Sequence, residues 1–417
     1  MQFKIFTFGC KVNAYESQAL KERLLDMGYE EAKGEDADVY FVNTCAVTNE
    51  AERKDLQKVR SISRNHPNKP IYIMGCSIQI HKEFYKDIPG VKGMVGSSNK
   101  NIIETLYDNG CNTIVDRVEE DSRHFVYQDT PTKVGEKNVR GYVKVQDGCD
   151  NFCSYCVVPF TRGNSRSRDH ESILRECRSL IENGSKELII GGIDTGSYKD
   201  PGNPEYRLKD LLRDMLSLSG QPYRIRVSSI EASQVDDDYI CLFRENPDRL
   251  CPHYHLPLQS GSEHVLRRMN RKYHLSDYLS LTERIRNEIP NVAFSTDVIT
   301  GFPGETEEEF NETYEFCKKV GFMRIHAFPY SERPFTMAAK LKDPVPMRIR
   351  MDRTKKLIAL SDENDALYRK KLNGQYVTVL VEGKNKQGKF EGYSENYLRI
   401  EMEDSSDITG EFKKIKI

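Results

Sequence analysis

The chain has 417 residues, with 62 basic and 64 acidic residues and a formal net charge of -2. A chain of this length is expected to form two or three domains. Its near-neutral charge excludes strong nonspecific binding of nucleic acid by the whole surface but allows local basic patches. We find no apolar run long enough to span a bilayer and no signal-peptide pattern, so we expect no membrane contact. The eleven cysteines are therefore expected in a reducing cytoplasm, as ligands or buried thiols.

Residues 1–130 alternate short apolar strands with polar helical stretches, which predicts an α/β domain built on a parallel sheet. Strands are expected at Phe3–Phe8, Val39–Asn43 and Ile71–Met74. Each is followed by one cysteine, and these are Cys10, Cys45 and Cys76. Singly, each would be interpreted as a buried core thiol. Ligands bind beyond the carboxyl ends of parallel strands, so the three together predict a metal-cluster site at that edge.

A polar linker is expected at Asp129–Asn138, followed by a second series of strands and helices over residues 135–368. The expected strands are Gly141–Gln146, Glu187–Gly192, Arg224–Ser229, His253–Leu258, Phe294–Thr300 and Arg324–Phe328. The expected helices between them are His170–Asn183, Leu208–Leu218, Asp236–Glu245, Ser276–Glu288 and Glu305–Val320. Six such strands predict a partial (β/α)6 barrel whose active residues lie at the carboxyl ends of its strands.

The most specific motif of the chain follows the first of these strands. Cys149, Cys153 and Cys156 are spaced Cys-x3-Cys-x2-Cys. Three thiolates in one short loop can hold an iron-sulfur cluster by three of its irons and leave the fourth open to another ligand. The alternative is a structural zinc site, which needs four ligands, usually in two pairs, and the sequence has no such second pair.

Several other residues near the predicted catalytic face are candidates for ligand contacts. Tyr155 could cover a cluster or lie near a bound adenine, or it could be a core aromatic residue. Gly191 and Gly192, at the end of the second strand, allow close approach of a ligand to the backbone. Glu231, which follows Ser229 at a strand end, could accept bonds from ribose hydroxyls, or be a solvated acid.

Three arginines follow the cysteine loop, and two histidines share one strand face. Arg162, Arg166 and Arg168 suit an anionic substrate or a phosphate backbone, and a solvated loop is the alternative. His253 and His255 lack an obvious third metal ligand, so we interpret them as packing residues of the barrel. Residues Thr306 to Glu309 resemble a helix N-terminal cap. The remaining cysteines lack partner spacing and are interpreted as buried thiols; they are Cys111, Cys177, Cys241, Cys251 and Cys317.

The C-terminal part begins with a charged helix around Met347–Lys371. Alternating segments then predict a small antiparallel β domain over residues 370–417. Its expected strands are Tyr376–Val381, Gly388–Tyr393 and Tyr397–Met402.

The cysteine loop resembles that of radical S-adenosylmethionine enzymes, and the ordered set of motifs narrows the resemblance to the methylthiotransferase family. These motifs are Thr7-Phe-Gly-Cys-Lys-Val-Asn, Asn43-Thr-Cys-Ala-Val-Thr-Asn-Glu, His255-Leu-Pro-Leu-Gln-Ser-Gly-Ser, Thr300-Gly-Phe-Pro-Gly-Glu-Thr and Pro329-Tyr-Ser-Glu-Arg-Pro. The C-terminal β domain is similar to the TRAM module with which such enzymes hold RNA. The first two motifs most resemble the branch that acts on N6-threonylcarbamoyladenosine beside the tRNA anticodon.

The resemblance implies two 4Fe-4S clusters and S-adenosylmethionine as cofactors. One cluster, on Cys149, Cys153 and Cys156, would bind S-adenosylmethionine and cleave it to a 5′-deoxyadenosyl radical that abstracts the adenine C2 hydrogen. An auxiliary cluster, on Cys10, Cys45 and Cys76, would carry the sulfur of the methylthio group. The implied S-adenosylmethionine contacts are Tyr155, Gly191, Gly192, Ser229, Glu231 and Gln259. The implied partners are tRNA, an electron donor such as flavodoxin or ferredoxin, and a sulfur source.

Three departures from the family pattern concern ligand and substrate contacts. Gly191-Gly192-Ile-Asp lacks the acidic third residue of the usual Gly-Gly-Glu, Leu56 stands where arginine is common, and Phe335 stands where glycine is usual. The alternative targets are isopentenyl-type tRNA adenosine and a ribosomal-protein aspartate. The alternative hypothesis from a different functional class is a noncatalytic RNA-binding protein with a structural metal, which would contain zinc without iron.

Overall fold

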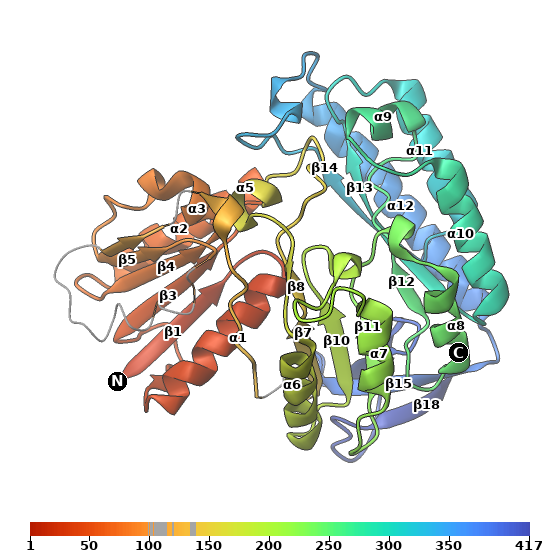
Figure 1. Cartoon of the computed structure of the whole chain (residues 1–417), viewed down its shortest axis with the longest axis horizontal. Coiled ribbons are helices and arrows are strands. Elements are labelled where there is room, and N and C mark those ends of the chain that lie inside the picture. The colour runs from red at the N-terminus through yellow and green to blue at the C-terminus, as the bar shows by residue number, and fades with distance from the viewer. Residues whose placement is uncertain (99, 101–102, 104–114, 119–120, 134–138) are drawn as a thin grey trace. The chain divides into compact units, whose positions relative to one another are not determined.

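The computed structural model describes residues 1–98, 100, 103, 115–118, 121–133 and 139–417 (Figure 1). The chain divides into two compact units. Unit 1 comprises Met1–Lys133, Gln146–Arg168 and Ser331–Ala339, and unit 2 comprises the described residues of Val134–Val145 together with Asp169–Tyr330 and Lys340–Ile417. These units cut across the predicted ranges 1–130, 135–368 and 370–417, because the cysteine loop packs with the N-terminal sheet and the C-terminal sheet packs with the barrel. None of the helices in the described ranges combines the length and apolar character that a membrane span requires.

Unit 1 is built on a six-stranded parallel sheet with the order β2-β1-β3-β4-β5-β6. The strands are β1 (Gln2–Thr7), β2 (Glu30–Glu31), β3 (Val39–Thr44), β4 (Ile71–Gly75), β5 (Val91–Val95) and β6 (Val115–Arg117). Strands β1, β3 and β4 confirm the three that the sequence predicts. The other three were not predicted: β2 and β6 have only two and three residues and give little periodic signal, and in β5 Lys92 and Gly93 interrupt the apolar run.

Helices cover both faces of this sheet. On one face, Val42 of β3 belongs to a buried cluster with Val59 of α2 (Asn49–Asn65). On the other, Phe41 belongs to a cluster with Leu20 of α1 (Lys11–Asp26). All six residues of β3 are buried, which is why this strand is a continuous apolar run rather than an alternating one.

Unit 1 also contains several short helices and strands. They are α3 (Cys76–His81), η1 (Lys82–Phe84), η3 (Ser122–His124), β8 (Gln146–Asp147), α5 (Val158–Arg162) and β9 (Arg166–Ser167). Strands β8 and β9 pair antiparallel at the base of the loop. Figure 1 shows α5 beside α3, and Val157 packs there against Cys76 in a small buried cluster.

Unit 2 contains six parallel strands in two neighbouring sheets, β7-β10-β11 and β12-β13-β14. They are β7 (Arg140–Lys144), β10 (Glu187–Gly191), β11 (Arg224–Val227), β12 (His253–His255), β13 (Ala293–Thr300) and β14 (Arg324–Pro329). Ile230 N–H donates to His255 O at 3.1 Å, which joins the second sheet to the first. All six confirm predicted strands, and the partial barrel is confirmed.

The helices of unit 2 follow the predicted alternation. They are α6 (His170–Glu182), α7 (Leu208–Leu216), α8 (Asp237–Glu245), α9 (Glu263–Arg268), α10 (Leu275–Glu288), α11 (Glu307–Val320) and α12 (Met347–Lys371), with single turns η4 (Thr195–Ser197) and η5 (Ala232–Gln234). A further single turn, η6 (Ala338–Lys340), begins in unit 1, which extends to Ala339. Helix α11 begins with the predicted cap, since Thr306 Oγ1 accepts from Glu309 N–H at 3.2 Å and Glu309 accepts from Thr306 N–H at 3.0 Å.

The C-terminal segment forms an antiparallel sheet with the order β17-β16-β15-β18. Its strands are β15 (Tyr376–Lys384), β16 (Phe390–Ser394), β17 (Arg399–Met402) and β18 (Phe412–Lys416). The first three confirm the prediction, and β18 was missed because lysines interrupt its apolar pattern. Val377 and Val379 of this sheet share a buried cluster with Ala293 and Met323, at the amino-terminal ends of β13 and β14.

Glu187 is fully buried at the amino-terminal end of β10 and binds three arginines. Its carboxylate accepts from Arg224 Nε at 2.6 Å and Arg226 Nε at 3.0 Å, and Arg140 Nε lies 3.3 Å away. Arg224 also donates to Thr378 O at 2.9 Å. This cluster therefore ties the C-terminal sheet to the end of the barrel opposite the predicted catalytic face, where buried residues serve stability.

Candidate iron-sulfur sites

All six cysteines of the two predicted cluster sites belong to unit 1. Cys45 and Cys76 directly follow β3 and β4, and Cys10 lies in the turn after β1, which ends at Thr7. These strands are neighbours in the sheet, so the three cysteines share one edge of it. Cys10 is exposed, whereas Cys45 and Cys76 are buried. Gly9 (φ 92°) lies against Cys45, and a Cβ on it would lie 2.6 Å from Cys45 Sγ. Only glycine therefore lets the turn that carries Cys10 approach Cys45 this closely.

The environment of Cys45 disfavours a bare thiolate. Burial raises the pKa of Cys45 to about 12, and the charges of Cys76 and Cys10 contribute in the same direction. A backbone N–H, that of Val47, donates to Cys45 Sγ at 3.4 Å. Thiolates at this place need compensation by a cation, and the irons of a cluster would supply it. The residues present thus fit an auxiliary cluster.

Asp55 is a buried carboxyl beside Cys45 that the sequence analysis missed. It is fully buried on α2, and its Oδ2 accepts from Cys45 N–H at 2.7 Å. Burial raises the pKa of Asp55 to about 8. Its position on the same helix face as Glu52 and Val59 is the only signal that marked it as inward-facing.

The loop that carries Cys149, Cys153 and Cys156 is folded back on itself by backbone hydrogen bonds. Cys149 N–H donates to Gly163 O at 3.0 Å, and Cys156 N–H donates to Cys153 O at 2.9 Å. All three cysteines are partly accessible, and Asn151 N–H donates to Cys149 Sγ at 3.5 Å. Partly accessible cysteines suit a cluster that must bind a further ligand.

Within the described ranges, three possible metal-ligand atoms lie within 4.8 Å of one another at Asp169, His170 and Asp200.

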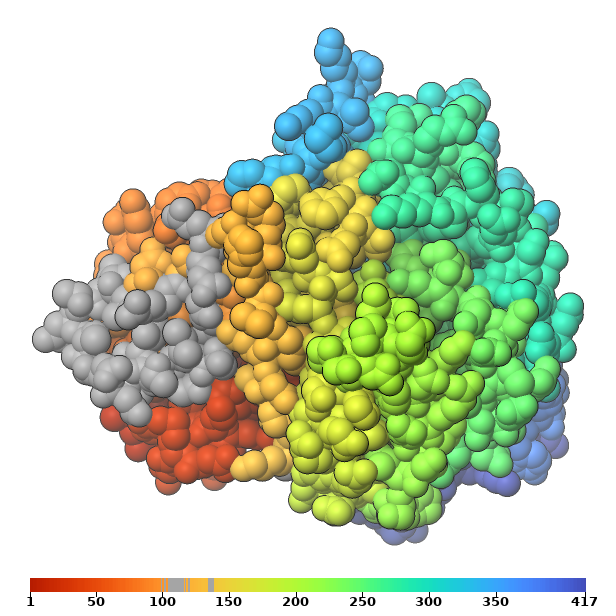
Figure 2. Space-filling view, viewed as in Figure 1, coloured from red at the N-terminus to blue at the C-terminus, as the bar shows by residue number. Residues whose placement is uncertain are grey.

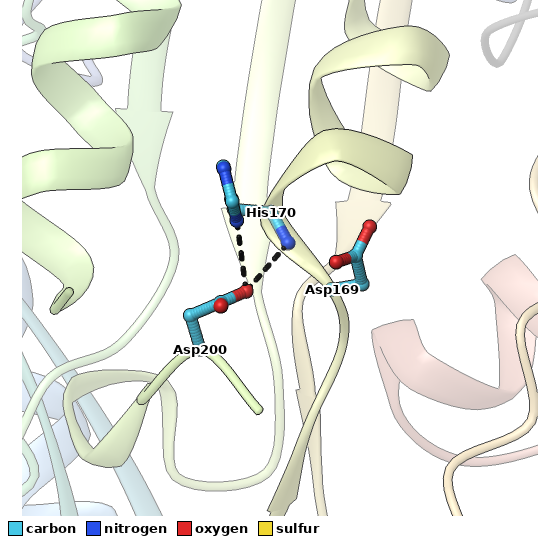
Figure 3. Close-up of side chains that lie close together, drawn as sticks. All are labelled: Asp169, His170 and Asp200. Atoms are coloured by element: carbon cyan, nitrogen blue, oxygen red, sulfur yellow. Dashed lines mark hydrogen bonds and ion pairs between the residues drawn. The ribbon is translucent and has the colours of Figure 1, made fainter. Parts of the chain in front are cut away.

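The group of Asp169, His170 and Asp200 serves as a structural junction rather than a metal site (Figure 3). Asp200 Oδ1 accepts from His170 N–H at 2.9 Å and lies 3.0 Å from His170 Nδ1. Asp200 Oδ2 accepts from Asn203 N–H at 2.8 Å. Asp169 caps α6 by accepting from Ser172 N–H at 2.8 Å. The carboxylates are thus occupied by local donors, which fix the turn at Asp200 against the start of α6.

The three arginines expected at the substrate are largely buried in ion pairs. Arg162, 1 % exposed, donates to Glu16 Oε1 at 3.0 Å, to Asp147 Oδ1 at 3.0 Å and to Asn13 Oδ1 at 2.7 Å. Arg168 pairs with Asp129 at 2.7 Å and is also 1 % exposed.

Burial of this kind favours a structural role for Arg162 and Arg168. Arg166 pairs with Asp147 at 3.1 Å, and its side chain keeps 12 % exposure. Sequence analysis could not separate these roles, because ion-paired and phosphate-binding arginines have the same local pattern.

The strand-end residues expected to bind S-adenosylmethionine lie in unit 2. Gly191 ends β10, and a Cβ there would collide with the hydroxyl oxygens of Tyr142 and Ser228. Ser229 and Glu231 follow β11, and Glu231 is ion-paired with Arg271. Burial raises the pKa of Glu231 despite this partner.

Gln259 follows β12 in the left-handed conformation (φ 65°). Its N–H donates to Asp297 O at 2.8 Å, and its carbonyl accepts from Ile299 N–H at 2.9 Å, so its backbone extends the pairing with β13. In the same sheet, His253 is buried and lies 2.8 Å from Ser295 Oγ, which agrees with the predicted packing role. His255 lies 3.2 Å from Asp297.

Comparison with known families agrees with this architecture. The sequence model of the radical SAM superfamily matches residues 143–317. The sequence model of an uncharacterized protein family, UPF0004, matches residues 2–96. The barrel, the cysteine loop and the first match define a radical S-adenosylmethionine protein with a 4Fe-4S cluster.

Relatives similar over the full length identify the family. The threonylcarbamoyladenosine tRNA methylthiotransferase MtaB of Bacillus subtilis is 36 % identical over 99 % of this chain and 92 % of its own length. The enzyme of the same name from Thermotoga maritima is 37 % identical over 99 % of this chain and 94 % of its own. A tRNA-2-methylthio-N(6)-dimethylallyladenosine synthase of Clostridium botulinum is 35 % identical over 100 % of this chain and 92 % of its own length. The chain belongs to the radical SAM tRNA methylthiotransferase family.

Solved structures show the same fold at low identity. The radical S-adenosylmethionine methyltransferase TsrM from Kitasatospora setae, solved with cobalamin and a [4Fe-4S] cluster bound, has a TM-score of 0.60 at 13 % identity and covers 85 % of this chain and 80 % of its own. The cobalamin-dependent radical enzyme OxsB has a TM-score of 0.52 at 10 % identity, over 89 % of this chain and 56 % of its own. These likenesses concern the fold alone.

Proposed function

We propose that this enzyme is a tRNA methylthiotransferase that adds a methylthio group to C2 of N6-threonylcarbamoyladenosine next to the anticodon. The observation that carries the proposal is the identity of 36 % and 37 % to two MtaB enzymes over 99 % of the chain. The dimethylallyladenosine synthase at 35 % identity makes isopentenyl-type tRNA adenosine the second candidate substrate.

The chain's own residues would provide two cluster sites in one compact unit. Cys149, Cys153 and Cys156 would hold the cluster that binds and reductively cleaves S-adenosylmethionine, which supplies the radical chemistry. Cys10, Cys45 and Cys76 would hold an auxiliary cluster. The ion pairs of Arg162 fix α5, which follows the first trio, to α1, which follows Cys10. The protein thereby sets the distance between the two sites, and fixed geometry of this kind lowers the entropic part of a barrier.

The proposal includes partners that the reaction requires. A reductive cleavage needs an electron donor, for which flavodoxin or ferredoxin is suitable, and the methylthio group needs a sulfur source. A cytoplasmic location would give access to both and to tRNA. The strand-end residues Gly191, Gly192, Ser229, Glu231 and Gln259 and the loop residue Tyr155 are proposed to contact S-adenosylmethionine.

The test compares single cysteine variants of the anaerobically reconstituted protein. Cys149→Ala is expected to abolish formation of 5′-deoxyadenosine, whereas Cys10→Ala should retain it but give no methylthio product. Cys241→Ala, outside both trios, serves as the matched control and should retain both activities. Full product formation by the Cys10 variant would refute the assignment of two clusters.

Substrate choice is tested with three substrates offered in parallel, with the product measured by mass spectrometry. These are tRNA carrying threonylcarbamoyladenosine, tRNA carrying isopentenyladenosine, and the ribosomal protein. Product on the first alone supports the proposal, and product on either of the others would assign that molecule as the substrate instead. Zinc without iron or acid-labile sulfide would instead support a noncatalytic RNA-binding protein.

A further inference from the structure

Three accessible phenyl rings lie in contact on unit 1. Phe152 is 50 % exposed, Phe160 37 % and Phe335 60 %. The ring centroids of Phe152 and Phe160 are 6.3 Å apart with the planes at 83°, and those of Phe160 and Phe335 are 6.0 Å apart at 37°. We call these three rings the aromatic platform. Figure 2 shows the segment around residues 146–168, in yellow, at the surface beside the orange residues of the N-terminal domain. Adjacent exposed aromatic rings are costly in water and typical of binding surfaces.

Two platform residues have an unfavourable backbone conformation. Phe152 has φ 47° and Phe335 has φ 67°, in the left-handed region that bulky residues rarely adopt. Glycine would take this conformation without cost. The phenyl ring of Phe335 gains little from burial to offset the strain. Strain that persists at an exposed side chain is typical of binding and active sites.

The segment that carries Phe335 is anchored on both sides within unit 1. Arg333, 2 % exposed, donates to Glu52 Oε2 at 3.0 Å. On the other side, Ala338 N–H donates to Ser154 O at 2.7 Å, inside the cysteine loop. Phe335 is therefore held in place beside the loop, and a ring fixed in advance loses little entropy when a ligand stacks on it.

We propose that the aromatic platform binds an unpaired base of the RNA loop that contains the target adenosine. This inference rests on the proposed function. Phe152 lies between Cys149 and Cys153, so a base on the platform is adjacent to the loop where the chemistry occurs. Enzymes that act on a base draw it out of its stack, which leaves the neighbouring base without a partner. Aromatic faces replace that stacking, and they do so for any base.

The test is RNA binding by Phe335→Leu, which removes the aromatic face but keeps an apolar side chain and the same backbone strain. The reconstituted full-length protein is titrated into an anticodon stem-loop RNA in which 2-aminopurine replaces the loop purine beside the target adenosine. The variant is expected to bind about tenfold more weakly, because stacking on one side chain accounts for a factor of about this size or more. It should also quench 2-aminopurine fluorescence less.

Three further proteins complete the experiment. Phe335→Trp should bind and quench like the wild type. Phe335→Gly should bind as weakly as Phe335→Leu while its thermal stability does not fall, since glycine relieves the backbone strain. Phe84→Ala removes another exposed ring of unit 1, which stacks on His81 at 4.5 Å, and should bind normally. The dependence of log Kd on log salt should be the same in all variants, because no phosphate contact changes.

The outcomes separate the two proposals. Equal binding and equal quenching by Phe335→Leu and the wild type would show that the aromatic platform does not bind a base, and would not affect the proposed function. Failure of the wild type to bind the stem-loop would overturn both. Weaker binding by Phe335→Leu without a change in quenching would show an apolar contact to another part of the RNA and would likewise overturn the stacking role.

Discussion

Arg162→Met provides the strongest test of how the cysteine loop is held. The guanidinium makes hydrogen bonds of 2.7 to 3.1 Å to Asn13, Glu16 and Asp147, and all three are buried. Its loss leaves two buried carboxylates with fewer cationic partners. Breaking a buried ion pair by removing one partner costs about 3–5 kcal/mol. We expect about 3 kcal/mol here, because Lys100 and Arg166 remain as partners.

The free energy of unfolding is measured by denaturant titration, alongside the salt dependence of RNA binding. Arg53→Met is the control: Arg53 pairs with Glu50 on the surface and is 55 % exposed, so its substitution should leave the free energy of unfolding nearly unchanged. If Arg162 instead contacted RNA phosphates, its loss would leave stability unchanged and lower the salt slope of binding by about one. That result would refute the structural role.

The remaining predictions concern unit 2. Glu187→Gln should destabilise the protein by about 3–5 kcal/mol, because three arginines lose a fully buried counter-charge. The control is Glu382→Gln: the Glu382 side chain is 20 % exposed, so this substitution should lower the free energy of unfolding by less than about 1 kcal/mol in the same denaturant titration. Equal losses of stability in the two variants would contradict the role of Glu187 at the centre of a buried cluster. Burial alone would lower the pKa of His170, but the hydrogen bond and charge of Asp200 raise it above 6.5. The protonated pair should therefore stabilise the protein fully below pH 6.5 and lose this contribution as the pH rises through the folded pKa. Asp200→Asn should remove that pH dependence from thermal melts. If NMR titration of the wild type showed no raised pKa for His170, the prediction would be wrong.

Sequence patterns predicted most of the fold because its strongest elements are locally encoded. All six barrel strands and the helix Met347–Lys371 were found at the expected places, since short strand segments alternate regularly with helical stretches in this part of the sequence. Strands β2 and β18 were missed, since one is two residues long and the other is interrupted by lysines. Cys111 and residues 134–138 of the expected linker lie outside the described residues.

For the candidate site, the sequence indicated the ligands but not their surroundings. Spacing identified Cys149, Cys153 and Cys156, and strand order placed Cys10, Cys45 and Cys76 at one edge. Neither pattern could show that both trios belong to one compact unit, because that depends on contacts between segments more than one hundred residues apart, such as Arg162 with Glu16.

The sequence by itself therefore determined the family, the barrel and the six cysteines, because these depend on local pattern and on motif spacing. Only the tertiary structure decided which arginines are buried, which carboxyl lies beside Cys45, and where the three phenyl rings meet. Burial and long-range contacts are set by how distant segments pack, and a lysine-rich or arginine-rich stretch has the same local sequence whether it faces solvent or a buried carboxylate. The ring of Phe335 shows the difference most clearly: the sequence marked it as a departure from glycine, and the structure placed it beside the cysteine loop.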